Sequence, residues 1–184
     1  MHFRETSIEG LYVVEPVVYG DERGFFYEQF QAVEFQSHGL VAQYLQDNCS
    51  SSQRYTLRGL HYQRAPYAQT KLVRAVVGRI LDVAVDIRPA SPTFGKHYAV
   101  ELSDTNHLAL YVPKGFAHGF LVLSDRAVVT YKCDALWDSA SEGGIAYNDP
   151  ALGISWPLDG AVPILSVKDQ QHPTLQKALE EGLL

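Results

Sequence analysis

A short stretch of the chain groups a base with cations. It reads Arg58-Gly59-Leu60-His61-Tyr62-Gln63 and is followed by Lys71. Side chains alternate along a strand with a period of two, so positions 59, 61 and 63 share one side and we expect His61 to face a cavity. Histidine titrates near neutral pH, so it can take up and return a proton, as proton abstraction beside a carbonyl group requires. Arg58 and Lys71 would then hold an anionic group.

A lone histidine is more often bonded to a neighbouring backbone group than used in chemistry. His61 is not isolated, because Gln46, Asp47 and Asn48 add polar groups that can face the same cavity. The alternative for these three residues is a turn, which asparagine and aspartate favour.

The composition is that of a globular protein without general affinity for nucleic acid or anionic membranes. The chain has 184 residues, of which 46% are hydrophobic and 20% charged, which suits one domain, 1–184, with a substantial core. Its net charge is −6, so an anionic ligand must be held by a local basic cluster. Arg23, Arg58 and Lys71 are the candidates.

Cysteine content and hydropathy predict a cytoplasmic protein. Cys49 and Cys133 are too few for a disulfide framework, and we interpret them as small buried residues. The first residues lack the apolar segment of a signal peptide, and no apolar run reaches the roughly 18 residues that span a bilayer.

The pattern of apolar residues predicts an all-β fold with a few short peripheral helices. Leu81, Val83 and Val85 alternate with Asp82 and Ala84, and proline and glycine punctuate the chain at short intervals. This favours a cupin-type jelly roll, an antiparallel β-sandwich or barrel, over alternating βα units. Strands are expected at residues 41–48, 71–77, 80–87, 98–102, 108–112, 120–123 and 127–133, and helices at 32–38 and 174–181.

An early strand is expected at residues 11–18, where the residues are apolar and β-branched. Pro16 interrupts this run and cannot donate to a ladder, so the strand should lie at an edge or pair outside the main sheet. A bare edge invites a second subunit, which predicts a homodimer.

A second motif, Pro113-Lys114-Gly115-Phe116-Ala117-His118-Gly119-Phe120, resembles the second motif of the cupin family. Its proline and glycine set a tight entry into a strand that would carry His118 on the inner face. In metal-binding cupins the first motif supplies His-x-His followed by a carboxylate. The counterpart here is His61-Tyr62-Gln63, with glutamine for one histidine and no glutamate in the expected place, so we expect no bound metal.

A fuller resemblance, from about Gly10 to Leu175, is to the dTDP-4-dehydrorhamnose 3,5-epimerase family, whose members are metal-independent cupins. The motifs that carry it are Asp21 to Phe26, Gln46 to Asn48, Arg58 to Gln63, Lys71, Pro113 to Phe120, Thr130 to Lys132 and Leu165 to Asp169.

The resemblance implies roles for individual residues. His61 would be the base, Asp169 its orienting partner, Tyr131 the general acid, and Lys71 the cation near the keto oxygen. Trp137 would stack on the nucleotide base, at a place where the family more often has tyrosine. The implied substrate contacts are Arg23, Phe25, Glu28, Gln46, Asp47, Asn48, Arg58, His118, Trp137, Glu142 and Lys168.

The implied reaction suits these residue types. A 4-keto sugar has acidic C–H bonds on both carbons beside the carbonyl group, and proton removal leaves an enolate that a fixed positive charge can stabilise. Inversion also needs a proton donor on the face opposite the base, so His61 and Tyr131 fit better than one group alone. We therefore expect a dTDP-sugar substrate and no cofactor.

Alternatives stay open at this point. Without the resemblance, Asp169 would cap the last helix and Tyr131 would be a core residue. An epimerase acting at C3 or C5 alone, a related ketoisomerase, a metal-dependent cupin oxygenase and an inactive sugar-binding module would retain much of the same pattern.

Overall fold

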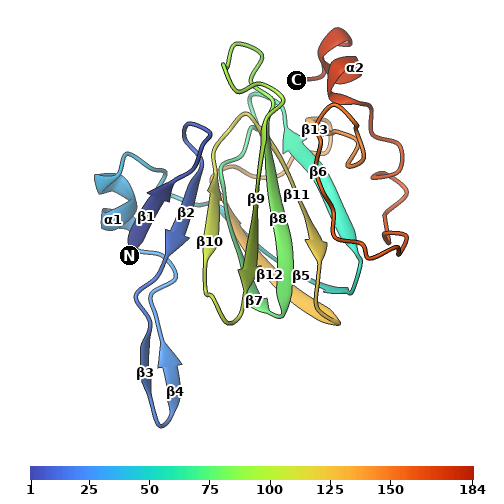
Figure 1. Ribbon diagram of the computed structural model, residues 1–184. Helices are drawn as coiled ribbons and strands as arrows, with labels where there is room; N and C mark the ends of the chain where they lie inside the picture. The colour runs from blue at the N-terminus through green and yellow to red at the C-terminus, as the bar shows by residue number, and fades with distance from the viewer.

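The computed structural model describes all 184 residues and consists mainly of antiparallel β-strands, as predicted. One sheet lies behind the other in Figure 1, with a short helix beside the N-terminal strands and another near the C-terminus. Neither helix has the length and apolar character that crossing a membrane would require. The elements are β1 (His2–Glu5), β2 (Tyr12–Glu15), β3 (Tyr19–Asp21), β4 (Gly24–Phe26), α1 (Ala32–Ser37), β5 (Gln46–Gln53), β6 (Leu57–Gln63), β7 (Lys71–Val77), β8 (Arg79–Asp86), β9 (His97–Ser103), β10 (Ala109–Val112), β11 (Phe116–Val122), β12 (Arg126–Cys133), β13 (Glu142–Gly144) and α2 (Leu175–Glu180).

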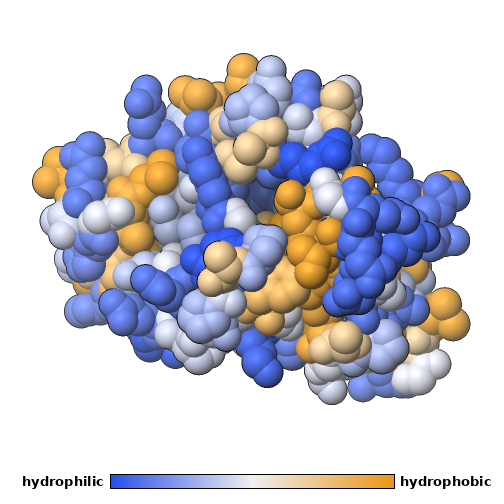
Figure 2. Space-filling model, turned by 90° about the horizontal axis from the view of Figure 1, so that it is seen from above, coloured by the Kyte–Doolittle hydropathy of each residue, from blue (hydrophilic) through white to orange (hydrophobic).

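Two large sheets enclose the core. The six-stranded sheet has the order β1-β2-β10-β7-β12-β5, and the five-stranded sheet has the order β13-β6-β11-β8-β9. Buried apolar side chains of both sheets meet between them, among them Val73, Ile80 and Phe120. Seen from above, the surface of the molecule is hollowed near its centre, with hydrophilic residues around much of the hollow (Figure 2).

The outer face of the five-stranded sheet is also buried. Val83 and Val85 of β8 belong to a second apolar cluster, which includes Leu175 and Ala178 of α2. The C-terminal segment runs along this side of the sandwich in Figure 1 and covers the sheet. Successive side chains of β8 therefore point into two different apolar layers. Asp82 and Asp86 of this strand are buried in the protein and do not face solvent.

The position of β2 corrects one prediction. This strand is not at an edge, because it pairs with β1 on one side and β10 on the other. Pro16 directly follows its last residue, so the missing N–H does not interrupt the ladder. The edge strand of this sheet is β1.

The strand predicted at residues 41–48 is displaced toward the C-terminus. It begins only at Gln46 and continues to Gln53. Val41 precedes it in a loop, where its N–H donates to the Tyr111 hydroxyl at 3.1 Å. The strand predicted at 120–123 is the end of β11, which starts inside the second motif. The other predicted strands from residue 71 onward and both helices are confirmed to within about one residue, whereas β1, β3, β4 and β13 were not predicted.

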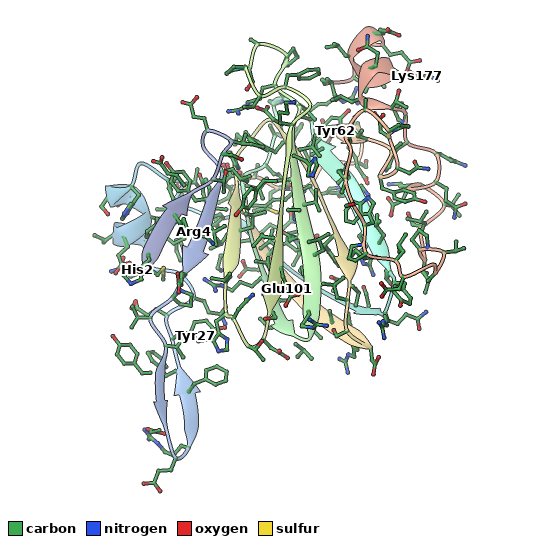
Figure 3. The ribbon with its side chains drawn as sticks, viewed as in Figure 1. His2, Arg4, Tyr27, Tyr62, Glu101 and Lys177 are labelled. Atoms are coloured by element: carbon green, nitrogen blue, oxygen red, sulfur yellow. The ribbon has the colours of Figure 1, made fainter.

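A hairpin formed by β3 and β4 projects from the body of the sandwich (Figure 1). Phe25 and Phe26 on this hairpin are 62% and 66% exposed. At its base, the rings of Phe25 and Tyr27 have centroids 4.7 and 4.9 Å from that of His107, and Figure 3 shows Tyr27 where the hairpin joins the body. The hairpin thus carries apolar surface that this chain leaves uncovered.

Candidate active site

A polar cavity of about 150 Å³ lies between the two sheets, and both sheets line it. Strands β5, β7 and β12 contribute from the six-stranded sheet, and β6 and β13 contribute from the five-stranded sheet. The lining residues are Gln46, Asn48, His61, Tyr62, Gln63, Gln69, Lys71, Tyr131, Trp137 and Glu142. Sequence reasoning had selected all of them as site residues except Tyr62, Gln63 and Gln69.

The backbone of β6 is irregular between Arg58, which is exposed, and His61, which lines the cavity. The register of β6 against β11 shifts, so that His61 lies opposite His118 and Arg58 lies opposite Phe120. Gly59 has φ +137°, and a Cβ at this position would lie 2.5 Å from the Cα of Gly119. Only glycine fits where the two backbones approach so closely.

Asp169 holds His61 from the C-terminal segment. Nε2 of His61 lies 2.5 Å from Oδ1 of Asp169, and Asp169 is 4% exposed. Burial acts to raise the pKa of this carboxyl, but contacts with His172 and His61 outweigh burial and hold the pKa well below its ordinary value. Because the ionised carboxylate accepts a hydrogen bond, Nε2 of His61 carries the proton and Nδ1 is the free basic nitrogen.

Lys71 enters the cavity beside His61. Its Nζ donates to the backbone oxygen of His61 at 3.5 Å. Burial lowers the pKa of the Lys71 ammonium, while Cys133, Asp82 and Glu142 act to raise it. The ammonium therefore lies in a desolvated place where a developing negative charge would be strongly stabilised.

Tyr131 lines the cavity from the six-stranded sheet. Burial raises the pKa of its hydroxyl and the Cys133 thiol adds to this effect, whereas Arg58 opposes it. A phenol whose pKa is raised stays protonated at neutral pH, so Tyr131 is able to donate a proton.

His118 lies on the strand next to His61 and is paired with a buried aspartate. Its Nε2 is 2.9 Å from Oδ1 of Asp82, which is fully buried, and the second carboxylate oxygen of Asp82 has no partner. The prediction that His118 is on the inner face of its strand is confirmed, because it shares this face with Phe120 of the core.

Polar contacts fix the residues at the mouth of the cavity. Gln46 donates through Nε2 to Oδ1 of Asn48 at 3.0 Å, and Oε1 of Gln46 accepts the backbone N–H of Trp137 at 2.9 Å. The Trp137 side chain remains 54% exposed. Lys168 donates to Oε2 of Glu142 at 2.8 Å, which brings the C-terminal segment to the same mouth.

Eight predicted site residues do not line the cavity. Asp169, Lys168 and His118 lie next to residues that do, and Arg58 is exposed beside Ser52, whereas the other four lie elsewhere. Asp47 points to the opposite face of its sheet from Asn48 and pairs with Lys132 at 3.0 Å. This corrects its prediction as part of the cavity, since alternation along β5 turns it outward. Arg23 and Phe25 lie on the projecting hairpin, and Glu28 is exposed just after it.

His61, Asp169 and His172 are the residues that could bind a metal ion, since each offers a ligand atom and these atoms lie within 4.8 Å of one another. In the first cupin motif, Oε1 of Gln63 accepts the backbone N–H of Asp138 at 2.9 Å, so this side chain already has a protein partner.

His172 was missed by the sequence analysis. The spacing Asp-x-x-His from residue 169 to residue 172 was the signal that could have identified it.

The chain is similar to proteins of one family over nearly its whole length. The family described as dTDP-4-dehydrorhamnose 3,5-epimerase matches residues 5–177. The dTDP-4-dehydrorhamnose 3,5-epimerase of Salmonella typhimurium is 48% identical over 176 residues, which covers 95% of this chain and 96% of that protein. The protein of the same name from Escherichia coli is 47% identical over 185 residues, covering both chains completely.

Solved structures agree with these matches. A dTDP-6-deoxy-D-glucose-3,5-epimerase from Legionella pneumophila, crystallised with dTDP-4-keto-L-rhamnose, has a TM-score of 0.94 at 47% identity, covering 100% of this chain and 96% of that one. A 3'-monoepimerase from Streptomyces bikiniensis, in complex with dTDP-quinovose, has a TM-score of 0.93 at 40% identity, covering 98% of this chain and 91% of that one. The predicted cupin jelly roll is thereby confirmed.

Proposed function

The chain belongs to the dTDP-4-dehydrorhamnose 3,5-epimerase family, and we propose that it is the isomerase that converts dTDP-4-dehydro-6-deoxy-D-glucose into dTDP-4-dehydro-L-rhamnose. The reaction inverts the carbons on both sides of the C4 ketone by removing and returning protons. The observation that carries the proposal is the cavity in which His61, bonded to Asp169, lies with Lys71 and Tyr131.

The two sheets supply the two proton-transfer groups. In the proposed mechanism, Nδ1 of His61 removes the proton beside the ketone, and Asp169 stabilises the imidazolium that forms. The Lys71 ammonium holds the enolate oxygen. Tyr131 belongs to β12 of the six-stranded sheet and His61 belongs to β6 of the five-stranded sheet. A sugar ring between the sheets therefore meets base and acid on opposite faces, as inversion requires.

The size of the cavity supports a division of the substrate between the cavity and its mouth. A volume of about 150 Å³ suits the sugar ring, and in this proposal the nucleotide lies at the mouth. We propose that Arg58 and Lys168 hold the diphosphate, that Trp137 stacks on thymine, and that Gln46 and Asn48 bind polar groups between them. Glu142 and His118 complete the proposed substrate contacts of this chain.

Proton NMR of the substrate incubated with the protein in heavy water tests the proposed function. We expect deuterium at C3 and C5 and a product inverted at both carbons. Inversion at one carbon alone would instead assign a monoepimerase, the activity named for the Streptomyces bikiniensis relative. Absence of exchange at both carbons would contradict the proposal.

We also propose that the protein is a homodimer in which the β3–β4 hairpin completes the site of the partner. The hairpin projects from the body of its own chain (Figure 1), and the side chains of Arg23, Phe25 and Phe26 are exposed even though the Phe25 ring packs on His107. Arg23 offers a second guanidinium for a diphosphate, and Phe25 offers an apolar ring, at a place where this chain has no site for them. A second copy would cover the exposed apolar surface and receive both side chains.

Mixing two inactive variants tests this arrangement. Arg23→Ala and His61→Asn are each expected to be impaired as homodimers. After unfolding and refolding in equal amounts, about half of the dimers should be mixed, and one of their two sites should contain both native residues, which restores about a quarter of the native activity. Absence of recovery in a mixture that sediments as a dimer would place Arg23 and His61 in the same chain's site, and a monomer at micromolar concentration would contradict the dimer itself.

Activity is expected to survive prolonged dialysis against a metal chelator. The proposed base, acid and cation are the side chains of His61, Tyr131 and Lys71, so no step requires a metal ion. Turnover before and after dialysis, together with the metal content of the protein, checks this. Loss of activity that one particular metal restores would contradict the proposed mechanism.

A cytoplasmic location is part of the same proposal. Cys133 is buried as expected, whereas Cys49 is exposed, which corrects its prediction as a buried residue; both thiols are free, which suits a reducing compartment.

A further inference from the structure

A second imidazole lies against the carboxylate that holds His61. Nε2 of His172 is 3.5 Å from Oδ1 of Asp169, the same oxygen that His61 contacts at 2.5 Å. The two imidazole rings are 5.6 Å apart between centroids, with an angle of 74° between their planes. One carboxylate oxygen thus faces two histidine nitrogens.

The surroundings of His172 leave Asp169 as its natural partner. The side chain is 14% exposed, and Nε2 is fully buried without a hydrogen bond to any other group. A buried imidazole nitrogen without a partner costs free energy, which a small movement toward Asp169 would recover.

The lack of a side chain at Gly144 leaves room for the His172 ring beside Asp169. A Cβ at this position would lie 2.3 to 2.5 Å from three atoms of the His172 ring. Gly144 also lies opposite His61 in the pairing of β13 with β6. The backbone of β13 therefore leaves space for a second ring directly beside the proposed base.

We propose that His172 is a positioning residue that donates its Nε2–H to Asp169 and fixes the carboxylate for His61. This inference rests on the proposed function. With two donors on one oxygen, the carboxylate cannot rotate away from His61, so Nδ1 of His61 keeps its direction toward the substrate. His172 does not line the cavity, so it acts through Asp169 and not on the sugar itself.

Nitrogen-15 NMR of histidine-labelled native protein tests the proposal without substrate. We expect Nε2 of both His61 and His172 to carry a proton, with the signals assigned from the spectra of His61→Asn and His172→Gln. A spectrum in which Nε2 of His172 carries no proton would overturn the proposal. Because this measurement does not depend on turnover, it separates a failure of this inference from a failure of the proposed function.

Two substitutions at residue 172 separate donation from packing. Leucine fills similar space without a donor, whereas glutamine retains an N–H at a similar reach. We expect His172→Leu to lower kcat about tenfold with little change in KM, because orientation and not binding is lost. The His61 Nε2 proton should also move to lower field, since it becomes the only imidazole donor to that oxygen. His172→Gln should keep kcat within about twofold of the native value.

His97→Leu is the matched control, because His97 lies on β9, outside the site, and its Nδ1 donates to the backbone oxygen of Leu152 at 2.9 Å. It should leave kcat and the His61 signal unchanged. Equal losses in the leucine and glutamine variants, or a leucine variant with native kcat and an unmoved His61 signal, would show that His172 only fills space.

Discussion

Replacing His61 with asparagine is expected to stop deuterium uptake and inversion together. Without the base no enolate forms at either carbon, so the two events lose their common first step. Asparagine retains an amide N–H that can face Asp169, so the surroundings change little. We expect both rates to fall by about three to four orders of magnitude, measured by NMR of the substrate in heavy water and by the configuration of the product.

His97→Asn provides the control for this substitution, because it makes the same change in a histidine outside the cavity. Native exchange in this control, with circular dichroism spectra alike in all three proteins, would assign the loss to position 61. If His61→Asn still exchanged deuterium at the native rate, another group would have to be the base. His118, opposite His61 on β11, would then be the next candidate.

The parts of the fold that followed from the sequence are those with a local pattern. In β6, alternation correctly put His61 and Gln63 on the cavity side and Leu60 on the other, where it joins the cluster under the C-terminal segment. Tyr62 joins the same cluster but also lines the cavity, against the prediction. The register of β6 against β11 shifts between Arg58 and His61, where Gly59 closely approaches Gly119, and Arg58 is exposed beside Ser52. Such a shift depends on the neighbouring strand and has no signal in the motif itself.

What could not be predicted depended on contacts between distant parts of the chain. Pro16 predicts an edge position for β2, whereas β1 extends the sheet beyond it. The motif around Asp47 indicates that polar residues are present but not which of them face the cavity, because this depends on where β5 begins.

His172 shows the same limit within the site. Its proximity to His61 results from the packing of β13 and the C-terminal segment, and in particular from Gly144. The sequence shows only a histidine three residues after an aspartate. That spacing indicates a role for His172 only once Asp169 is known to bind His61.

Replacing Tyr131 with phenylalanine is expected to separate exchange from inversion. The variant keeps His61, Asp169 and Lys71, so the enolate still forms and deuterium still enters from the face of the base. Only the donor on the six-stranded side of the cavity is lost. Inverted product should therefore fall by about two to four orders of magnitude, the usual effect of losing a general acid.

The configuration of the deuterated sugar is the measurement that decides this. Deuterium at C3 or C5 with the starting configuration kept would mean that His61 removes and returns the proton on one face while the other face lacks a donor. The raised pKa of the native phenol supports this role, because burial keeps its proton in place until the enolate forms. Equal loss of exchange and inversion, with an unchanged circular dichroism spectrum, would show instead that the Tyr131 hydroxyl helps to form or stabilise the enolate, and the acid would have to be another group on the six-stranded side.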